Sequence, residues 1–204
     1  MTVELWQLAS GEAVQLQSSW GAQSIVIDQI EPVINGGASF AQARLGDVVQ
    51  VSCSVFAQGA PLAVLARWRH VDCGEWNSVY LSSAPDGLWQ GQFCVERAGL
   101  HVFCIDAWVD QYAGLCLELN RKYRAGDPVN EMIESGINQV LCAAHRWEGA
   151  DQQPLLLKLY ERLAGVSEEQ QIVALMHESS AALMRDTQER TFLALSPEFS
   201  LFVT

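Results

Sequence analysis

The fold is decided by the stretch from Gly46 to Gly59, which reads GDVVQVSCSVFAQG. Its apolar side chains at Val49, Val51 and Cys53 alternate with polar ones, and a turn signal stands at each end. Successive side chains of a strand point to opposite faces of a sheet, so this alternation predicts a strand with one face buried. The chain is therefore expected to build its core between sheets.

The neighbouring segments extend this pattern in both directions. From Leu62 to Trp68 alternate apolar residues face one way, while Arg67 and Arg69 face the other. Short strands separated by roughly 8 to 15 residues, with turn signals between them, predict a Greek-key β-sandwich. The further strands are predicted at Ser24–Glu31, Trp76–Leu81, Leu88–Val95 and Leu100–Val109, the last being the longest apolar strand.

Beyond Asp110 the apolar residues change to helical spacing. Asp127 is predicted to cap a helix that has Pro128 in its first position. Ser167 and Gln170 are spaced as a capping box at the start of a later helix. The predicted amphipathic segments run from Met132 to Leu141, from Leu155 to Leu163 and from Ile172 to Met176, and Ala181–Arg185 either continues the last one or forms a short fourth helix.

The chain returns to strand after these helices, at Thr191–Leu195 and Phe199–Val203. The sequence therefore predicts a mainly β protein in which a small helical bundle interrupts a β-sandwich. The expected domains are an N-terminal lead-in over residues 1–22, a sandwich over residues 23–112 and 190–204, and a helical insert over residues 113–189. A hydrophobic strand that ends at Thr204 also predicts that the chain is cut from a longer protein.

Charge and composition exclude several classes of function. The formal net charge is −12, from 24 acidic and 12 basic residues. A nucleic-acid-binding protein needs clustered Lys and Arg, so no nucleic-acid partner is expected. The chain shows no secretory signal and no apolar run of the roughly 18 residues that span a bilayer, so a cytoplasmic protein without a membrane partner is predicted.

The residues that usually carry catalysis or bind metals do not form a recognisable constellation. The six cysteines include no CxxC pair, and the four histidines are not at ligand spacing near them. We therefore predict no metal, no cofactor and no catalytic residues. His70 and Cys73 could form a thiol–imidazole pair, but no third group orients the histidine. Asp106 and Asp110 are interpreted as a satisfied polar residue and a strand-end cap rather than as a catalytic pair.

Aromatic residues gather in the predicted sandwich, at Trp68, Trp76, Trp89, Trp108 and Tyr112. An exposed flat ring can stack on the apolar face of a sugar, whereas a buried one belongs to the core. Trp68 and Trp108 are predicted to be core residues. Trp76 and Trp89 lie near turns, and for them sugar stacking and core packing remain open alternatives.

Several blocks of sequence resemble the N-terminal region of the GlgE-type maltosyltransferases. They are IVIDQIEPVINGG from Ile25, GDVVQVSCSVFAQG from Gly46, WRHVDCGEW from Trp68, GLWQGQF from Gly87, AGLHVFCIDAWVDQYA from Ala98 and GDPVNEMIESG from Gly126. Each block alone is weak, but six in the same order are specific. The chain departs from the family in loops at residues 38–43, 60–61 and 112–115.

This resemblance implies both a fold and a function. In that alpha-amylase-superfamily family the region is an immunoglobulin- or fibronectin-like domain interrupted by a helical insert, and it supports homodimerisation beside a separate catalytic barrel. The chain is then the non-catalytic N-terminal domain of an enzyme that elongates α-glucan from maltose 1-phosphate. Its expected partners are its own downstream catalytic domain and a second copy. The alternative is a glucan-binding module that uses Trp76 and Trp89.

Overall fold

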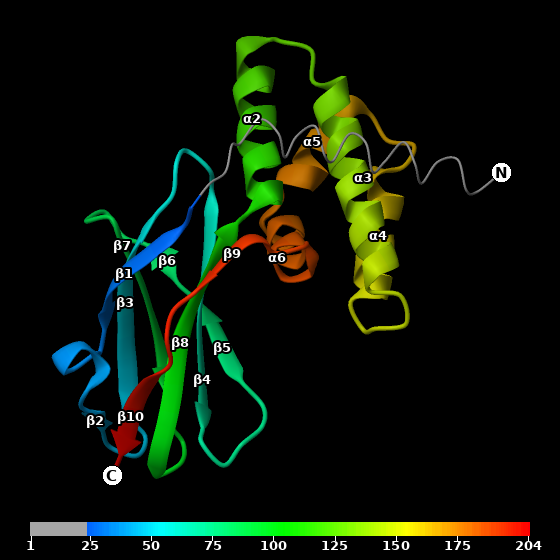
Figure 1. The fold of residues 1–204 in the computed structure, drawn as a ribbon. Helices are drawn as coiled ribbons and strands as arrows, with labels where there is room; N and C mark the ends of the chain where they lie inside the picture. Colours follow the sequence, from blue (N-terminus) through cyan, green and yellow to red (C-terminus); the bar gives the residue numbers. More distant parts are fainter. Residues whose placement is uncertain (1–23) are drawn as a thin grey trace. The chain divides into compact units, whose positions relative to one another are not determined.

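The computed structural model describes residues 24–204, so the predicted lead-in over residues 1–22 lies outside the described residues. The described chain forms two compact units (Figure 1). Residues 24–109 and 191–204 make the sheet unit, and residues 110–190 make the helical unit. No helix of residues 24–204 is long and apolar enough to cross a membrane.

The sheet unit contains two sheets. The strands of the first, in spatial order, are β1 (Val26–Glu31), β3 (Val48–Phe56), β7 (Leu88–Cys94) and β6 (Ser82–Ser83). The strands of the second are β2 (Ala41–Ala43), β10 (Phe199–Val203), β8 (Gly99–Val109), β4 (Leu62–His70) and β5 (Asn77–Tyr80), with β9 (Thr191–Leu195) also paired to β8. A single 3-10 turn, η1 (Asn35–Gly37), precedes β2. All pairs are antiparallel except β2 with β10.

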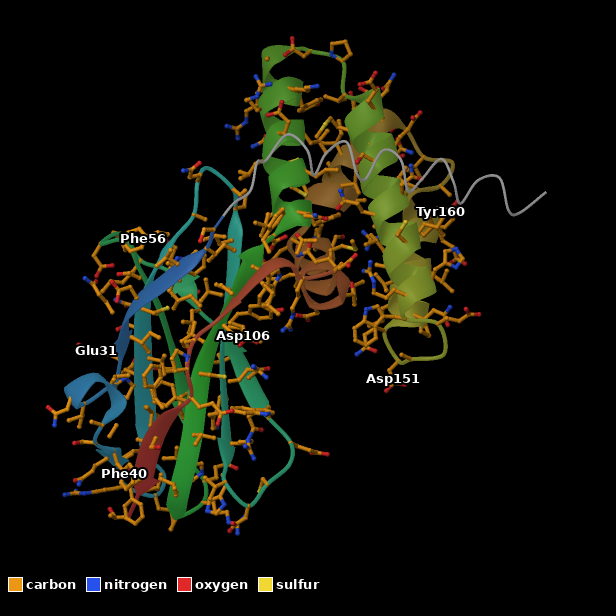
Figure 2. The ribbon with its side chains drawn as sticks, viewed as in Figure 1. Glu31, Phe40, Phe56, Asp106, Asp151 and Tyr160 are labelled. Atoms are coloured by element: carbon orange, nitrogen blue, oxygen red, sulfur yellow. The ribbon has the colours of Figure 1, made fainter. Side chains whose placement is uncertain are left out.

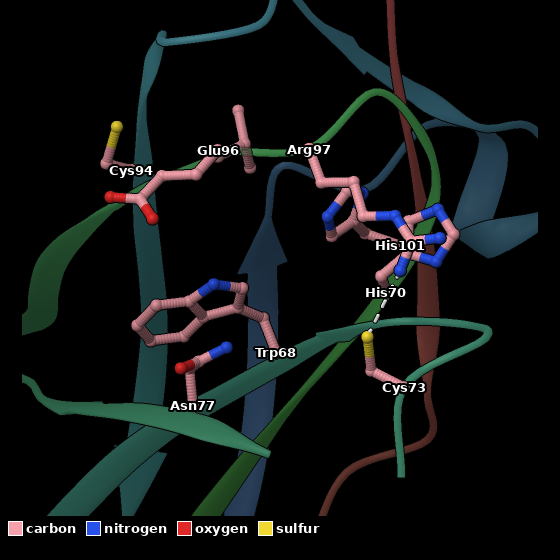
Figure 3. A pocket seen from close by; sticks show the side chains of 9 residues that line it. Trp68, His70, Cys73, Asn77, Cys94, Glu96, Arg97 and His101 are labelled. Carbon is pink, nitrogen blue, oxygen red and sulfur yellow. Dashed lines mark hydrogen bonds between the residues drawn. The ribbon is translucent and has the colours of Figure 1, made fainter. Parts of the chain in front are cut away.

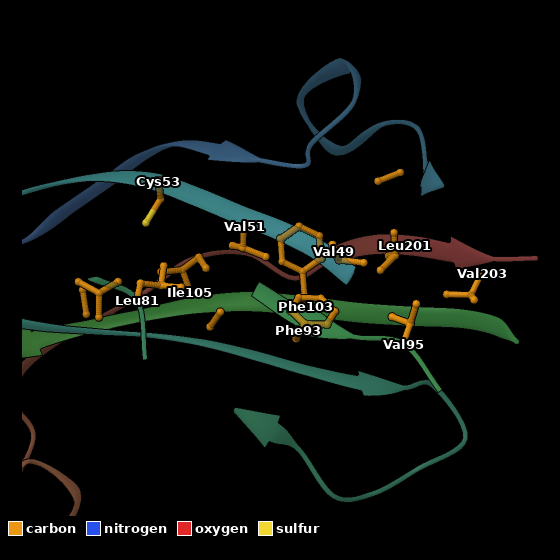
Figure 4. Close-up of a cluster of buried hydrophobic side chains, with 14 residues drawn as sticks. Val49, Val51, Cys53, Leu81, Phe93, Val95, Phe103, Ile105, Leu201 and Val203 are labelled. Carbon is orange, nitrogen blue, oxygen red and sulfur yellow. The ribbon is translucent and has the colours of Figure 1, made fainter. Parts of the chain in front are cut away.

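One hydrophobic core lies between the two sheets (Figure 4). Val49, Val51 and Cys53 on β3 contribute to it, as the alternation in their segment predicts, and all three are buried. Phe103 and Ile105 contribute from β8 in the opposite sheet, and both are fully buried. The period-two pattern thus placed the inward faces correctly.

The strand β4 is apolar on both faces. Val64 and Ala66 face the core between the sheets, whereas Ala63 and Leu65 belong to a second small cluster with Trp108. Trp108 is fully buried, and Trp68 packs partly buried against the main core, with its ring 4.3 Å from that of Phe93. The prediction that Trp68 and Trp108 are core residues is confirmed.

The helical unit contains five α-helices around a core of its own. They are α2 (Gln111–Ala125), α3 (Asn130–Arg146), α4 (Gln153–Leu163), α5 (Glu168–Met176) and α6 (Glu178–Thr187). Each helix from α2 to α6 contributes buried residues, including Leu119, Val140, Leu156, Leu175 and Met184. The capping box predicted at Ser167 and Gln170 is present at the start of α5, and Ala181–Arg185 lies in the separate helix α6 rather than in a continuation of α5.

The sequence pattern did not predict the start of the helical region correctly. It did not predict α2, and it placed Tyr112 with the aromatic residues of the sandwich, whereas Tyr112 is buried in the helical core and donates a hydrogen bond to the Leu175 carbonyl at 2.9 Å. Asp127 does not cap the next helix. Its backbone N–H instead donates to the Lys122 carbonyl, beside the left-handed Gly126 that ends α2.

The helical unit is joined at both ends to residues that pair with each other in one sheet. Val109 closes β8 and Thr191 opens β9, and the two residues are direct antiparallel partners. The helical unit therefore occupies the place of a hairpin loop between two paired strands. Asp110 begins the unit as the N-cap of α2, where its carboxylate accepts from the Ala113 N–H at 2.9 Å, so it caps a helix rather than only a strand end.

Candidate functional site

Trp76 precedes β5 and is held by two arginines of β4. The guanidinium carbons of Arg67 and Arg69 both lie 4.9 Å from the centre of the Trp76 ring. Residues i and i+2 of a strand share one face, which is why the two arginines reach the same ring. These cation–π contacts fix the orientation of the half-buried indole.

Arg67 also forms an ion pair with Asp106, which lies on β8 and is labelled in Figure 2. Its Nε and Nη2 lie 2.8 and 3.0 Å from the two carboxylate oxygens, and Asp106 is almost fully buried. Burial by itself lowers the pKa of Arg67, but the hydrogen bond and charge of Asp106 outweigh it and raise that pKa. Asp106 is therefore a satisfied structural carboxylate, as the sequence analysis interpreted it.

Trp89 lies in β7, in the other sheet, opposite Cys53 of β3 and Ser83 of β6. Its half-buried side chain packs against the core between the sheets. The structure thus separates the two candidate stacking residues, with Trp89 on β7 of the first sheet and Trp76 in the loop before β5 of the second. They do not form one continuous aromatic platform within a sheet.

A cavity of about 300 Å³ opens at one end of the sheet unit (Figure 3). Strands of both sheets and the turns between them line it. The lining residues are Trp68, His70, Cys73, Asn77, Cys94, Val95, Glu96, Arg97 and His101. The cavity lies where β4, β5, β7 and β8 begin or end, so its side chains come from segments that are distant in sequence.

Two histidines stand edge to face in this cavity. His70 and His101 are direct partners on β4 and β8, with ring centroids 5.0 Å apart. Gly99 makes room for them, because a Cβ at that position would lie 2.7 Å from His70 Nε2. Burial lowers the pKa of His101, opposed by the Gly99 carbonyl and reinforced by the charges of His70 and Arg97.

The tautomers of both rings follow from their partners. His101 Nδ1 lies 3.3 Å from the Gly99 carbonyl, which only accepts, so Nδ1 carries the proton and Nε2 has a free lone pair. His70 Nδ1 accepts from the Asp72 backbone N–H at 3.2 Å. Its proton is therefore on Nε2 when the ring is neutral.

Cys73 contacts Arg97 at the mouth of the cavity. The Arg97 guanidinium donates to Cys73 Sγ at 3.3 Å and lies 3.6 Å from the Asp72 carboxylate. His70 and Cys73, which the sequence suggested as a weak pair, thus line the same cavity, and the sulfur has Arg97 as its hydrogen-bond donor. No group of three or more His, Cys, Asp or Glu residues within residues 24–204 could hold a metal ion.

Most residues that line the cavity could not be predicted from the sequence. Glu96, Arg97 and Asn77 carry no motif, and the pairing of His70 with His101 depends on a strand register that no local pattern shows. The only local signal was the turn at Arg97-Ala98-Gly99, which leads from β7 in one sheet to β8 in the other. Long-range pairing therefore creates this site.

The helical unit exposes several large apolar side chains. Val173 of α5 is 68% exposed, and Leu155 and Leu157 of α4 are 56% and 40% exposed. The buried residues of these helices, such as Leu156 and Leu175, face the helical core instead. Apolar residues thus lie on both the inner and the outer faces of α4 and α5.

Comparison with known proteins identifies relatives along most of the chain. Residues 23–204 match the family described as alpha-1,4-glucan:maltose-1-phosphate maltosyltransferase, domain N/S. Curated proteins named alpha-1,4-glucan:maltose-1-phosphate maltosyltransferase are similar to it. The protein of Burkholderia pseudomallei is 30% identical over 125 residues, which are 61% of this chain and 11% of the relative.

Two further relatives match a larger share of the chain. The protein of Pseudomonas aeruginosa is 28% identical over 183 residues, which cover 88% of this chain and 27% of the relative. That of Chlorobaculum tepidum is 26% identical over 177 residues, which cover 86% of this chain and 26% of the relative. The chain thus spans about a quarter or less of the length of the relatives it matches.

Proposed function

Because the chain belongs to the N/S-domain family of the alpha-1,4-glucan:maltose-1-phosphate maltosyltransferases, we propose that it is the non-catalytic N-terminal domain of such an enzyme. The enzyme elongates α-glucan from maltose 1-phosphate, and this domain supports homodimerisation and the placement of the catalytic barrel. The family match over residues 23–204 is the observation that carries the proposal. The sheet unit serves as an immunoglobulin- or fibronectin-like sandwich, and the helical unit as its insert.

The proposed dimer uses the outer faces of α4 and α5. Leu155, Leu157 and Val173 are exposed there, and burying them against a second copy would remove apolar surface from water. The six free cysteines suit the reducing cytoplasm in which we place the dimer.

Sedimentation velocity tests the dimerisation. We expect the chain to sediment as a dimer at roughly 50 μM, a concentration at which a micromolar Kd gives mostly dimer. The double variant Leu155→Glu/Val173→Glu should sediment as a monomer, whereas Val26→Glu, which alters an exposed residue of β1, should remain a dimer. A monomeric unmodified chain would contradict this part of the proposal.

The non-catalytic role has a separate test. We expect no release of inorganic phosphate when the chain is incubated with maltose 1-phosphate and maltooligosaccharide. Measurable turnover that scales with the concentration of the chain would show that it has catalytic residues of its own.

A second candidate function is a glucan-binding module. It is favoured by the fixed, half-buried ring of Trp76, which Arg67 and Arg69 hold in place. Stacking a sugar on Trp76 or Trp89 would shift the tryptophan fluorescence on addition of maltooligosaccharide. Loss of that shift in Trp76→Ala or in Trp89→Phe would identify the ring responsible, and an unchanged emission spectrum would exclude both.

A further inference from the structure

We propose that the cavity lined by Trp68, Glu96 and His101 binds one pyranose ring of a neutral carbohydrate. This site differs from the surface rings of Trp76 and Trp89, since neither of them lines the cavity. Its assignment to a unit of an α-glucan chain rests on the proposed function, while the preference for a neutral, hydroxyl-rich ligand rests on the cavity itself.

His101 supplies an acceptor to the cavity. His101 is 5% exposed, and its Nδ1 donates to the Gly99 carbonyl at 3.3 Å, which leaves Nε2 of the neutral ring as an acceptor. A ligand that donates a hydrogen bond to this nitrogen would satisfy it, so a donor group is favoured there. A hydroxyl group is such a donor.

The rest of the lining alternates acceptors with donors. The Glu96 carboxylate has no hydrogen-bond partner among residues 24–204 and accepts from hydroxyls, while the Asn77 amide both donates and accepts. Figure 3 shows Glu96 and Asn77 on either side of the Trp68 ring, while the side chain of Arg97 extends toward His70 and His101. Sugar hydroxyls, which are donors and acceptors at once, match this mixed lining.

The indole supplies the apolar surface that a sugar ring needs. Phe93 stacks on Trp68 at an interplanar angle of 13°, which fixes the indole, and the half-buried ring lines the cavity. The C–H groups of a pyranose can pack against such a ring. The volume of about 300 Å³ is at the lower end of the range for ligand sites, which suits one ring rather than a long chain.

An anion such as phosphate fits the cavity less well. It would meet the Glu96 carboxylate and the lone pair of His101 Nε2, and both repel it. Arg97 already contacts Asp72, with 3.6 Å between its Nη2 and the carboxylate oxygen. The charges at the cavity are thus largely balanced, which favours a neutral ligand.

Titration with maltose, followed by NMR of the tryptophan indole N–H groups, tests the proposal. We expect a saturable shift of the Trp68 signal with a Kd in the millimolar range, typical of weak binding. Glycerol, which has no ring, and inorganic phosphate should give no saturable shift at the same concentrations. Single Trp→Phe variants assign the indole signals of Trp68, Trp76 and Trp89.

Variants of exposed lining residues complete the test without disturbing the core. Glu96→Ala should weaken maltose binding by about ten-fold or more, because a hydrogen bond to a charged group is lost. Glu75→Ala, which removes an exposed carboxylate outside the cavity, is the matched control and should bind maltose normally. Asn77→Ala should weaken binding by a few-fold.

The pH dependence adds an independent readout. Protonation of His101 removes the acceptor at Nε2, so affinity should be constant above pH 6.5 and fall as the pH is lowered through the reduced pKa of His101. The groups that face this ring or lie near it are His70, Arg97, Glu96, Asp72 and Cys73. The same pH series on Glu96→Ala shows whether the dependence persists without the Glu96 carboxylate.

Three results would overturn the proposal. They are the absence of any saturable shift with maltose up to roughly tens of millimolar, a shift confined to Trp76 or Trp89, and saturable binding of phosphate in place of maltose. Each would leave the dimerisation test by sedimentation unaffected, so failure of the sugar site and failure of the proposed function are distinguishable.

Discussion

The side chain of Arg67 makes two kinds of contact, one with Asp106 and one with Trp76. It forms an ion pair and a hydrogen bond with the buried carboxylate of Asp106, and it covers the ring of Trp76 together with Arg69. The planar guanidinium matches the two carboxylate oxygens, which lysine cannot do. The two arginines therefore offer a matched comparison, since both contact Trp76 and only Arg67 contacts Asp106.

Replacing Arg67 tests how much this ion pair contributes to the free energy of unfolding. Arg67→Met leaves the buried carboxylate without its cation and should lower the free energy of unfolding by about 3 kcal/mol. Arg69→Met removes one cation–π contact and a hydrogen bond to the Cys73 carbonyl, and should cost about 1 kcal/mol. Urea denaturation measures both, and equal losses would show that Asp106 does not depend on Arg67.

The buried His101 predicts a dependence of stability on pH. Its pKa in the folded chain is lower than in the unfolded chain, so the unfolded state binds a proton more readily. The free energy of unfolding should therefore be highest above pH 6.5 and decrease as the pH falls below that value. Urea denaturation between pH 8 and pH 5 measures it, and a His101→Asn variant with the same pH profile would contradict the assignment.

Single residues were predictable only where their neighbours in sequence decide their environment. Val51 and Cys53 were placed in the core because alternation along one strand is enough to choose a face. The contact of His70 with His101 was not predictable, since it depends on the register between two strands. For the same reason the cavity could not be assembled from the sequence.

At the scale of elements, the start of the helical unit depends on one glutamine. Gln188 follows α6, and its side-chain amide donates to the Asp110 carboxylate at 2.8 Å and accepts from the Tyr112 N–H at 3.2 Å. Asp110 itself caps α2 through Ala113. The residue that ends α6 thus completes the N-terminal cap of α2.

Removing this glutamine should loosen both helices. Gln188→Ala deletes two hydrogen bonds and leaves the buried Asp110 with fewer donors, so we expect a loss of about 2 kcal/mol in the free energy of unfolding. Gln171→Ala, which deletes one hydrogen bond to the Leu163 carbonyl, should cost about 1 kcal/mol. If thermal and urea denaturation show a larger loss for Gln171→Ala than for Gln188→Ala, the cap of α2 does not depend on Gln188.

The elements that were predicted correctly carry strong local signals. The capping box of α5 and the alternating strands are visible in single segments. The helix α2 was missed because only Tyr112, Leu115 and Leu119 are buried on it and Gly114 stands in its first turn. Asp127 was misassigned because a cap-like residue beside a proline is equally compatible with the end of the preceding helix.

At the scale of the whole molecule, the pairing of Val109 with Thr191 makes the two units separable in the chain. A two-residue turn such as Asn-Gly joins antiparallel strands at this distance. We predict that a chain in which Asn-Gly replaces residues 110–190 folds cooperatively into the two sheets, and that residues 110–190 alone form helices. Circular dichroism and NMR dispersion measure both, and an unfolded sheet chain would show that the sheets need the helical unit.

The position of β10 also sets the order in which the protein can form during synthesis. Residues 199–203 lie between β2 and β8, so residues 41–43 gain their parallel partner only after residues 44–198 have been synthesised. Pairings between such distant segments form slowly, whereas helices depend on local contacts. The nascent chain is thus expected to carry folded helices while one edge of β8 still exposes unpaired backbone. Chaperones that protect open strand edges would act during this interval, and substitutions in β10 would reduce yield more than they reduce the stability of the folded sheets.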